Sequence, residues 1–270
     1  MTNVPRCLAA DQALAMALDV AREAADLVKK GWGRVGEVRS KRVPTDLVTE
    51  WDLASERLIV ERLAERAPFV RILGEEVGAR IPEGASRERW LVDPIDGTVN
   101  FAHGLPLFSI SIGYEAFGES EAGVVIAPAL GWEFAAAKGK GAFMNGEPIH
   151  VSCADSLEKS LVATGFPYDR ATSPQNNFRE FLHMQRVCGG VRRLGSASLD
   201  LCLVARGWLD GYWEFKLKPW DLAAGTVIVR EAGGRVTSLE GGPFSAEEGE
   251  AIASNGLIHE AMVRELAEVP

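Results

Sequence analysis

The sequence lacks the features that mark several large classes of protein. It contains only four cysteines and four histidines in 270 residues, and no C-x-x-C motif brings two cysteines together along the chain. A disulfide framework or a zinc site is therefore not expected, and the cysteines should be reduced thiols. They are Cys7, Cys153, Cys188 and Cys202.

Long hydrophobic runs and excess positive charge are also missing. No stretch approaches the roughly 18 consecutive apolar residues that a membrane-spanning helix requires. Asp11, Gln12 and Asp19 interrupt the N-terminal region, so we expect no signal peptide and a cytoplasmic location. The net charge of −9 gives no electrostatic basis for binding nucleic acid or an anionic membrane. An acidic protein that binds an anionic substrate needs cations to mediate the contact.

The length and the pattern of apolar residues suit two closely packed halves. We expect an N-terminal α+β subdomain over residues 1–152 and a C-terminal α/β subdomain over residues 153–270. Apolar residues three or four apart predict helices over 11–30 and 49–68, separated by a basic, glycine-rich loop or hairpin. Strand-like runs predict a sheet over about 69–152, with a tight turn at Asn145-Gly146. Strands alternate thereafter with helices over 173–188, 196–205, 221–232 and 257–268.

The most informative stretch is Asp93-Pro-Ile-Asp-Gly-Thr98, which directly follows the apolar run Trp90-Leu-Val. Carboxylates beside an apolar run are unfavourable unless a cation or metal compensates them. The proline and the glycine make the turn rigid, so two carboxylates and a hydroxyl are directed at nearly one point. Such oxygen ligands are the ones that Mg²⁺ prefers. Taken alone, this pattern would more often be an Asx-type turn with two solvated aspartates.

Three further acidic clusters lie where predicted strands end or helices begin. Gly74-Glu75-Glu76 follows a strand, and two adjacent glutamates point in different directions, so only one should join the aspartates. Asp46 and Asp52 flank a Leu-Val-Thr stretch, where helix capping is the alternative for Asp52. Asp221 precedes an apolar helix and is also at a capping position.

Taken together, these segments resemble the inositol monophosphatase family. The matching segments run, in family-like order and spacing, over nearly the whole chain. They are Lys41 to Asp52, Gly74-Glu-Glu76, Asp93 to Phe101, Lys138 to Gly146, Gly195-Ser-Ala197 and Trp220 to Gly225. The resemblance implies a five-layer αβαβα sandwich of mixed α+β and α/β character. It also implies Mg²⁺-dependent hydrolysis of a phosphate monoester and, commonly, a homodimer.

The resemblance further implies a role for each matching residue. Around one Mg²⁺ it places Glu75, Asp93, the Ile95 carbonyl and the Thr98 hydroxyl, and around a second it places Asp93, Asp96 and Asp221. The implied catalytic residues are Asp52 and Thr98, which would position and deprotonate the attacking water, together with Glu75. The implied substrate-binding residues are Gly97, Thr98, Gly195, Ser196, Ala197, Glu214 and Asp221. Lys41 and Glu76 receive supporting roles.

The substrate is open to several interpretations. A carboxylate such as Glu214 accepts hydrogen bonds from adjacent hydroxyls and repels a second phosphate, which favours inositol 1-phosphate over fructose 1,6-bisphosphate or a nucleotide 3′,5′-bisphosphate. Lys218 complicates this preference, and histidinol phosphate remains an alternative. So does a regulatory binding protein that has kept the fold, although every motif position is filled. Because a metal lowers the pKa of bound water, we expect His103 to be a structural hydrogen-bonding residue and not a base.

Overall fold

The structure, a computed structural model, describes residues 8–41 and 43–269, so Cys7 and Arg42 lie outside the described residues. Its α-helices are α1 (Ala10–Gly31), α2 (Glu50–Arg66), α3 (Thr98–Ala102), α4 (Phe178–Val187), α5 (Ala197–Ala205), α6 (Pro219–Glu231) and α7 (His259–Ala267). Its strands are β1 (Val38–Ser40), β2 (Leu47–Thr49), β3 (Arg71–Gly74), β4 (Ala79–Arg80), β5 (Arg89–Asp96), β6 (Ser109–Ala116), β7 (Glu119–Ala127), β8 (Trp132–Ala137), β9 (Ala142–Met144), β10 (Glu147–Ile149), β11 (Leu161–Thr164), β12 (Gly190–Arg192), β13 (Gly211–Phe215), β14 (Arg235–Thr237) and β15 (Glu250–Ser254). Two 3₁₀ turns are η1 (Leu157–Lys159) and η2 (Ala246–Glu248).

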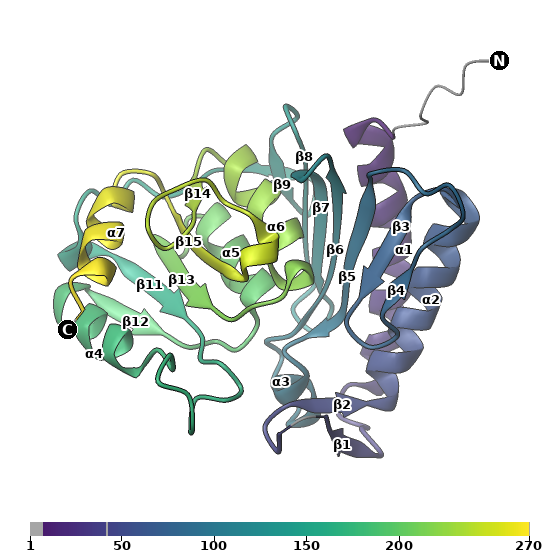
Figure 1. Ribbon diagram of the computed structural model, residues 1–270, viewed down its shortest axis with the longest axis horizontal. Helices are drawn as coiled ribbons and strands as arrows, with labels where there is room; N and C mark the ends of the chain where they lie inside the picture. The colour runs from purple at the N-terminus through teal and green to yellow at the C-terminus, as the bar shows by residue number, and fades with distance from the viewer. Residues whose placement is uncertain (1–7, 42, 270) are drawn as a thin grey trace.

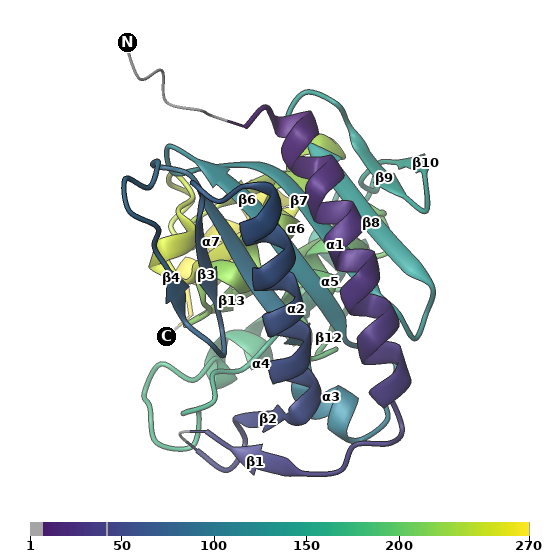
Figure 2. The ribbon, with the colours of Figure 1, turned by 90° about the vertical axis from the view of Figure 1, so that its right-hand side faces the viewer.

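Five layers of secondary structure form the molecule (Figure 1). An eight-stranded sheet has the order β10-β9-β8-β7-β6-β5-β3-β4, and a five-stranded sheet has the order β12-β11-β13-β15-β14. Helices α1 and α2 lie side by side across the outer face of the large sheet (Figure 2). Helices α5 and α6 lie between the sheets, and α4 and α7 cover the small one. The predicted αβαβα sandwich is therefore confirmed.

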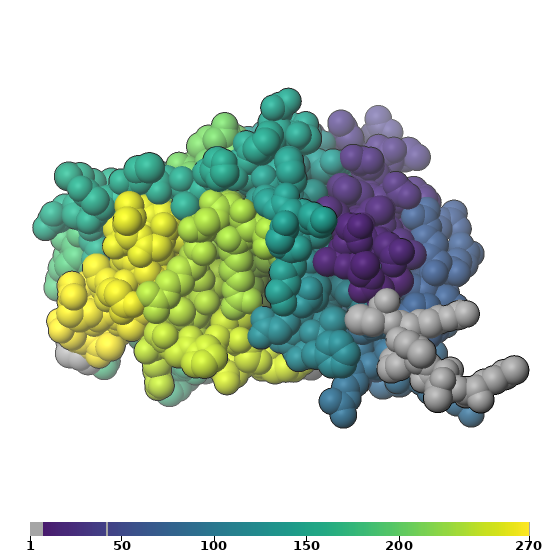
Figure 3. All heavy atoms as spheres, turned by 90° about the horizontal axis from the view of Figure 1, so that it is seen from above, coloured from purple at the N-terminus to yellow at the C-terminus, as the bar shows by residue number. Residues whose placement is uncertain are grey.

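Each sheet belongs to one part of the chain. The large sheet uses residues 71–149 and the small sheet uses residues 161–254. Seen from above, the purple residues of α1 and the yellow residues of α7 lie on opposite sides of the molecule (Figure 3). Because α6 packs against strands of both sheets, the division into subdomains at residue 152 stays a prediction.

The strand register brings two acidic turns to one edge of the large sheet. β3 and β5 are parallel, and Gly74 at the end of β3 pairs with Val92 of β5. Glu75 and Asp93 follow these two residues in the chain, so they lie at the same edge. β5 also pairs with β6, with a register shift between Asp93 and Asp96, and this irregularity ends the strand in the turn.

Helix α6 is held against the large sheet by glycines. A Cβ on Gly113 would lie 2.7 Å from Ala223 Cβ, and a Cβ on Gly123 would lie 2.6 Å from Ala224 Cα. Only a residue without a side chain permits this approach. Because Asp221 is in the first turn of α6, this packing fixes the position of Asp221 relative to the large sheet.

Some predicted elements differ from the observed ones. The helix predicted from residue 173 begins at Phe178, because Asn177 adopts a φ of 66°. The Asn177 side chain is buried and bonds Thr164, Gly165 and Trp213. The hairpin at Asn145-Gly146 is confirmed, and the three described cysteines are free thiols. None of the helices among the described residues combines the length and apolarity needed to cross a membrane.

Candidate active site

Asp93 lies at the centre of a group of carboxylates. It is 2% exposed, and its Oδ1 accepts a hydrogen bond from Ile95 N at 3.0 Å, which makes the turn an Asx turn. Burial raises the pKa of Asp93 well above its ordinary value, and the charges of Glu75, Asp96 and Asp221 raise it further. These four carboxylates, which lie far apart in the sequence, are therefore electrostatic neighbours in the fold.

The Thr98 hydroxyl connects this turn to helix α2. Gly97 has a φ of 93°, which starts the short helix α3 and leaves Thr98 buried at 6% exposure. Thr98 Oγ1 lies 3.0 Å from Asp52 Oδ1 and 3.0 Å from the Ile95 carbonyl oxygen. A hydroxyl donates only one hydrogen, and an ionised carboxylate is a stronger acceptor than a carbonyl oxygen, so Thr98 donates to Asp52. Asp52 also caps α2, because its Oδ2 accepts hydrogen bonds from Thr49 N and Oγ1.

Asp96 is bonded to the start of helix α5. Its Oδ2 accepts hydrogen bonds from Ser196 Oγ at 2.7 Å, Ser198 N at 2.7 Å and Ser198 Oγ at 2.6 Å. Its Oδ1 accepts a longer hydrogen bond from Ala197 N, at 3.3 Å. The predicted substrate segment therefore lies directly against the acidic turn, and the hydroxyl of Ser196, which is 1% exposed, is committed to Asp96.

Two glycines allow the predicted phosphate and substrate segments to touch. A Cβ on Gly97 would lie 3.1 Å from the Gly195 carbonyl oxygen, and a Cβ on Gly195 would lie 2.7 Å from Arg193 Nη1. Both glycines have a φ of 93°, which other residues rarely adopt. Backbone and side chains from β5, α3 and the start of α5 therefore meet within van der Waals distance.

Asp221 reaches the group from helix α6. Its Oδ2 accepts a hydrogen bond from Lys218 N at 2.7 Å, so the capping role that the sequence left open is present. Burial raises the pKa of Asp221 well above its ordinary value, and the charges of Asp96 and Glu75 raise it further. One carboxylate thus caps α6 and faces the other acids.

Lys41 supplies a positive charge to the group. It lies between β1 and β2, and its Nζ bonds Glu75 Oε1 at 2.8 Å and also bonds Glu76. Burial disfavours the ammonium, but the charges of Glu75 and Glu76 outweigh this effect and raise the pKa of Lys41. Lys41 therefore partly neutralises the carboxylates, as a supporting residue would.

Glu214 is buried on strand β13, at 9% exposure, on the other side of the start of α5. Its Oε2 accepts a hydrogen bond from Tyr212 Oη at 2.7 Å, and a Cβ on Gly165 would lie 2.1 Å from its Oε1. Burial raises the pKa of Glu214 to about 7, against the opposing effects of Tyr212 and Arg193.

A cavity of about 510 Å³ adjoins these residues. The residues that line it include Val99, His103, Phe166, Tyr168, Arg170 and Arg193. Burial of the phenol, followed by the charges of Glu75 and Asp221, raises the pKa of Tyr168, so this lining residue lies near the acidic group. His103 is exposed, and its ring has no hydrogen-bond partner among residues 8–41 and 43–269. The prediction that His103 forms a structural hydrogen bond was therefore wrong.

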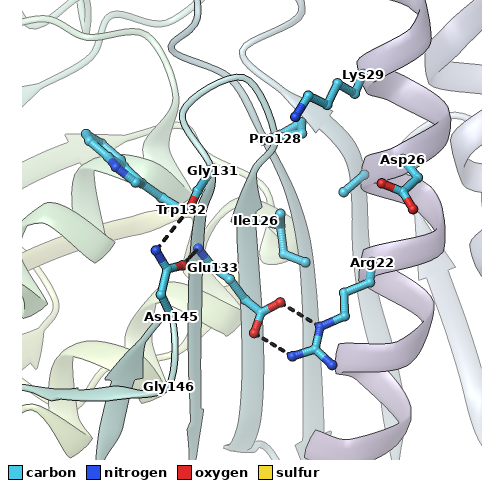
Figure 4. Close-up of a pocket in the computed structure, with 11 residues that line it drawn as sticks. Arg22, Asp26, Lys29, Ile126, Pro128, Gly131, Trp132, Glu133, Asn145 and Gly146 are labelled. Atoms are coloured by element: carbon cyan, nitrogen blue, oxygen red, sulfur yellow. Dashed lines mark hydrogen bonds and ion pairs between the residues drawn. The ribbon is translucent and has the colours of Figure 1, made fainter.

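A second cavity, of about 430 Å³, lies far from the acidic group, between α1 and strands β7 and β8 (Figure 4). Four charged side chains line it: Asp26, Lys29, Arg22 and Glu133. Arg22 and Glu133 bond each other through two contacts of 2.7 Å. The Asn145 side chain bonds the backbone of Gly131 and Glu133. The polar groups of Arg22, Glu133 and Asn145 are therefore engaged within the protein.

Two buried polar residues of α2 were not identified from the sequence. Ser55 Oγ donates to the Pro94 carbonyl oxygen at 3.2 Å, and Glu56 accepts hydrogen bonds from the backbone of Glu76 and Val77. Both are 0% exposed. Their signal was the i, i+3, i+4 spacing from Asp52, which puts three polar side chains on one helix face.

The donor atoms of the acidic group suit a hard cation. They are carboxylate, carbonyl and hydroxyl oxygens, which suit hard divalent cations such as Mg²⁺, Ca²⁺ or Mn²⁺. Among the described residues, no three Asp, Glu, His or Cys side chains are arranged closely enough to hold a metal ion as they stand. Two of the predicted ligands point at protein partners, because Glu75 is bonded to Lys41 and Asp96 to the start of α5.

Comparisons with known proteins agree on one family. A sequence profile of the inositol monophosphatase family matches residues 9–270. An inositol-1-monophosphatase from Synechocystis sp. is 44% identical over 239 residues, which cover 88% of this chain and 83% of that protein. A Thermotoga maritima protein named fructose-1,6-bisphosphatase/inositol-1-monophosphatase is 41% identical over 256 residues, which cover 95% of this chain and 96% of that one. The solved structure of inositol monophosphatase from Anabaena (Nostoc) sp. has a TM-score of 0.87 at 40% identity and covers 95% of this chain and 96% of that one.

The fold and these relatives define the class of protein, a phosphatase built as a layered αβαβα sandwich. More particularly, the chain belongs to the inositol monophosphatase family.

Proposed function

We propose that this phosphatase hydrolyses a small polyol phosphate in a Mg²⁺-dependent reaction, with inositol 1-phosphate as its preferred substrate. The observation that carries the proposal is the position of the Thr98 hydroxyl, 3.0 Å from Asp52 Oδ1, on the turn that holds Asp93 and Asp96. A hydroxyl between a carboxylate base and a cluster of metal-type ligands suits activation of water beside a phosphate.

The acidic residues would hold the metal. Glu75, Asp93, the Ile95 carbonyl and the Thr98 hydroxyl would bind one Mg²⁺, and Asp93, Asp96 and Asp221 would bind a second. When bound, Mg²⁺ supplies positive charge to the phosphoryl oxygens and lowers the pKa of water. The ionised carboxylates would at the same time gain the compensating charge that their burial requires.

The remaining steps belong to the side chains and backbone of the site. The Gly97 and Thr98 N–H groups would hold the phosphate at the start of α3. Thr98 Oγ1 would accept a hydrogen bond from the attacking water while it donates its own hydrogen to Asp52 Oδ1. Asp52 would act as the final proton acceptor, because two bonds from Thr49 already fix its other oxygen. Glu75 would help to orient the same water.

Glu214 supports a polyol as the alcohol part of the substrate. Tyr212 occupies its Oε2, so Oε1 remains to accept a hydroxyl hydrogen. The backbone of residues 195–197 lies beside the acidic turn and would contact the same ring. The Synechocystis relative named inositol-1-monophosphatase supports the same substrate.

Fructose 1,6-bisphosphate is a second candidate, favoured by the charge of the adjoining cavity. Arg193 is exposed and has no ion pair or hydrogen bond with any described residue, and Arg170 bonds only the Pro167 carbonyl. These guanidinium groups would attract a second phosphate and oppose the repulsion from Glu214. The Thermotoga relative, whose name includes both activities, agrees with this possibility.

A substrate panel tests the proposal. Phosphate release is measured against Mg²⁺ concentration for inositol 1-phosphate, fructose 1,6-bisphosphate, histidinol phosphate and adenosine 3′,5′-bisphosphate. We expect the highest kcat/KM for inositol 1-phosphate, with no turnover after chelation. If kcat/KM for a bisphosphate is equal or higher, and Arg193→Ala abolishes that activity, then the bisphosphate and not inositol phosphate is the preferred substrate. Assembly as a homodimer and a cytoplasmic location stay predictions.

A further inference from the structure

A buried glutamate on α2 holds the backbone of one acidic turn. Glu56 is 0% exposed, and its two carboxylate oxygens accept separate hydrogen bonds from Glu76 N at 2.6 Å and Val77 N at 2.9 Å. Both donors belong to the turn that carries Glu75, on which the predicted metal site depends. A carboxylate is costly to bury, so this pair of charge-assisted bonds is what makes its position stable.

We propose that Glu56 is a positioning residue for the metal site, a role that rests on the proposed function. By fixing the backbone of the turn through Glu76 and Val77, Glu56 keeps Glu75 at the sheet edge that it shares with Asp93. It would not touch the metal or the substrate. Its effect is exerted through the turn.

The shape of the turn supports this role. A Cβ on Gly74 would lie 2.0 Å from Glu56 Oε1 and 2.6 Å from its Cδ, so the carboxylate occupies the space beneath the turn. Gly74 N donates to the Gly78 carbonyl oxygen at 3.1 Å and closes the other side. The turn is therefore held between its own backbone and the Glu56 side chain.

Helix α2 also holds the other acidic turn. Ser55 bonds the Pro94 carbonyl oxygen and Asp52 bonds Thr98, so residues of one helical face reach both turns. The β3–β5 register brings Glu75 and Asp93 to one edge of the sheet, and the rigid backbone of α2 adds a second link between their turns through Glu56 and Ser55. Metal ligands held in this way bind with less loss of freedom than ligands on a mobile loop.

Lys41 also contacts this turn, but in a different way. It bonds the side chains of Glu75 and Glu76 through a flexible four-carbon chain, whereas Glu56 bonds the backbone. Loss of Lys41 would change the charge at Glu75. Loss of Glu56 would release the turn itself.

Variants that remove the two backbone bonds test the proposal. Glu56→Ala deletes the acceptors, Glu56→Gln keeps the size but replaces one acceptor by a donor, and Gly74→Ala displaces Glu56 without altering it. Glu61→Ala, at an exposed position on the same helix, is the matched control. Mg²⁺ binding is measured by calorimetry, with kcat and KM at saturating Mg²⁺. Amide exchange at Glu76 and Val77 is measured in the metal-free protein.

We expect Glu56→Ala and Gly74→Ala to weaken Mg²⁺ binding by about 10–100-fold, the range for residues that orient metal ligands. Exchange at Glu76 and Val77 should accelerate, and KM for inositol 1-phosphate at saturating Mg²⁺ should change less than about threefold. Glu56→Gln should fall between wild type and Glu56→Ala, and Glu61→Ala should match wild type.

Unchanged Mg²⁺ affinity in folded Glu56→Gln and Gly74→Ala would overturn the role of Glu56 while leaving the phosphatase proposal intact. A wild-type protein that neither binds Mg²⁺ nor releases phosphate would instead overturn the proposed function. In that case, amide exchange would still test whether Glu56 fixes the turn, and unchanged exchange would refute it.

Discussion

Replacing Thr98 by valine would remove one hydroxyl and keep nearly the same shape. The hydroxyl oxygen, Thr98 Oγ1, lies 3.0 Å from Asp52 Oδ1 and 3.0 Å from the Ile95 carbonyl oxygen. The variant leaves Asp52 Oδ1 without this donor in a buried position, which should cost about 1–3 kcal/mol of stability. Without the hydroxyl, Asp52 can no longer receive a proton through Thr98. We expect kcat to fall by about 10²–10⁴-fold, equivalent to about 2.7–5.5 kcal/mol in the barrier.

Thr98→Ser is the matched control, because it keeps the hydroxyl and loses only a methyl group. It should retain kcat within about tenfold of wild type, while its stability drops by about 1 kcal/mol. The assay is phosphate release from inositol 1-phosphate at saturating Mg²⁺, with urea unfolding of each variant. A folded Thr98→Val variant with a kcat within threefold of wild type would refute the proton path through Thr98.

Three further predictions concern the acidic group, the packing of α6 and the effect of pH. Asp93→Asn should lower kcat/KM by roughly 10³-fold or more while the protein stays folded, because a neutral amide is a poor ligand for two cations. Gly123→Ala should lower the free energy of unfolding by about 1–3 kcal/mol, since the new Cβ would lie 2.6 Å from Ala224 Cα. His259 is buried between Thr237 and Ser254, and burial, followed by the charge of Arg235, lowers its pKa from 6.5 to about 4. The unfolded chain therefore binds a proton that the folded protein excludes, so this stability contribution is present above pH 6.5 and is lost as the pH falls towards 4.

Each of these predictions has an outcome that contradicts it. Full turnover in Asp93→Asn would contradict the metal assignment. A wild-type protein without phosphatase activity would instead support a regulatory binding role. Unchanged urea midpoints would show that α6 can move away from β7. For His259 the expected loss is about 1–2 kcal/mol, less than the full shift implies, because solvent and salt screen Arg235. A His259→Asn variant with the same acid-dependent loss as wild type would rule out His259 as its source.

The positions of the main strands along the chain and of the acidic turns could be predicted because local pattern determines them, whereas their order within each sheet could not. An apolar run that stops at Asp93-Pro-Ile-Asp implies a strand followed by a rigid turn, whatever the rest of the fold. The short helix α3 was missed, because five residues give no helical periodicity. The late start of α4 depends on bonds from Asn177 to Thr164 and Trp213, which are distant in sequence. No local pattern contains that information.

Helix α2 shows most clearly where the sequence interpretation failed. Of its apolar residues, Ile59 and Leu63 are buried, whereas Leu53 and Val60 are only half-buried. The buried face also contains Asp52, Ser55 and Glu56. A search for apolar periodicity passes over polar residues at the same spacing. Their burial is favourable only because the turns of β3 and β5 supply partners, and those turns become neighbours only in the folded sheet.

The most direct test of the account is a crystal structure of the protein with Mn²⁺ in place of Mg²⁺ and with bound phosphate. The account predicts anomalous scattering peaks at the acidic group, with Asp93 in contact with more than one cation and the phosphate next to Gly97 and Thr98. Peaks confined to other parts of the surface, with the Asp93 and Asp221 carboxylates unligated in an active enzyme, would contradict it.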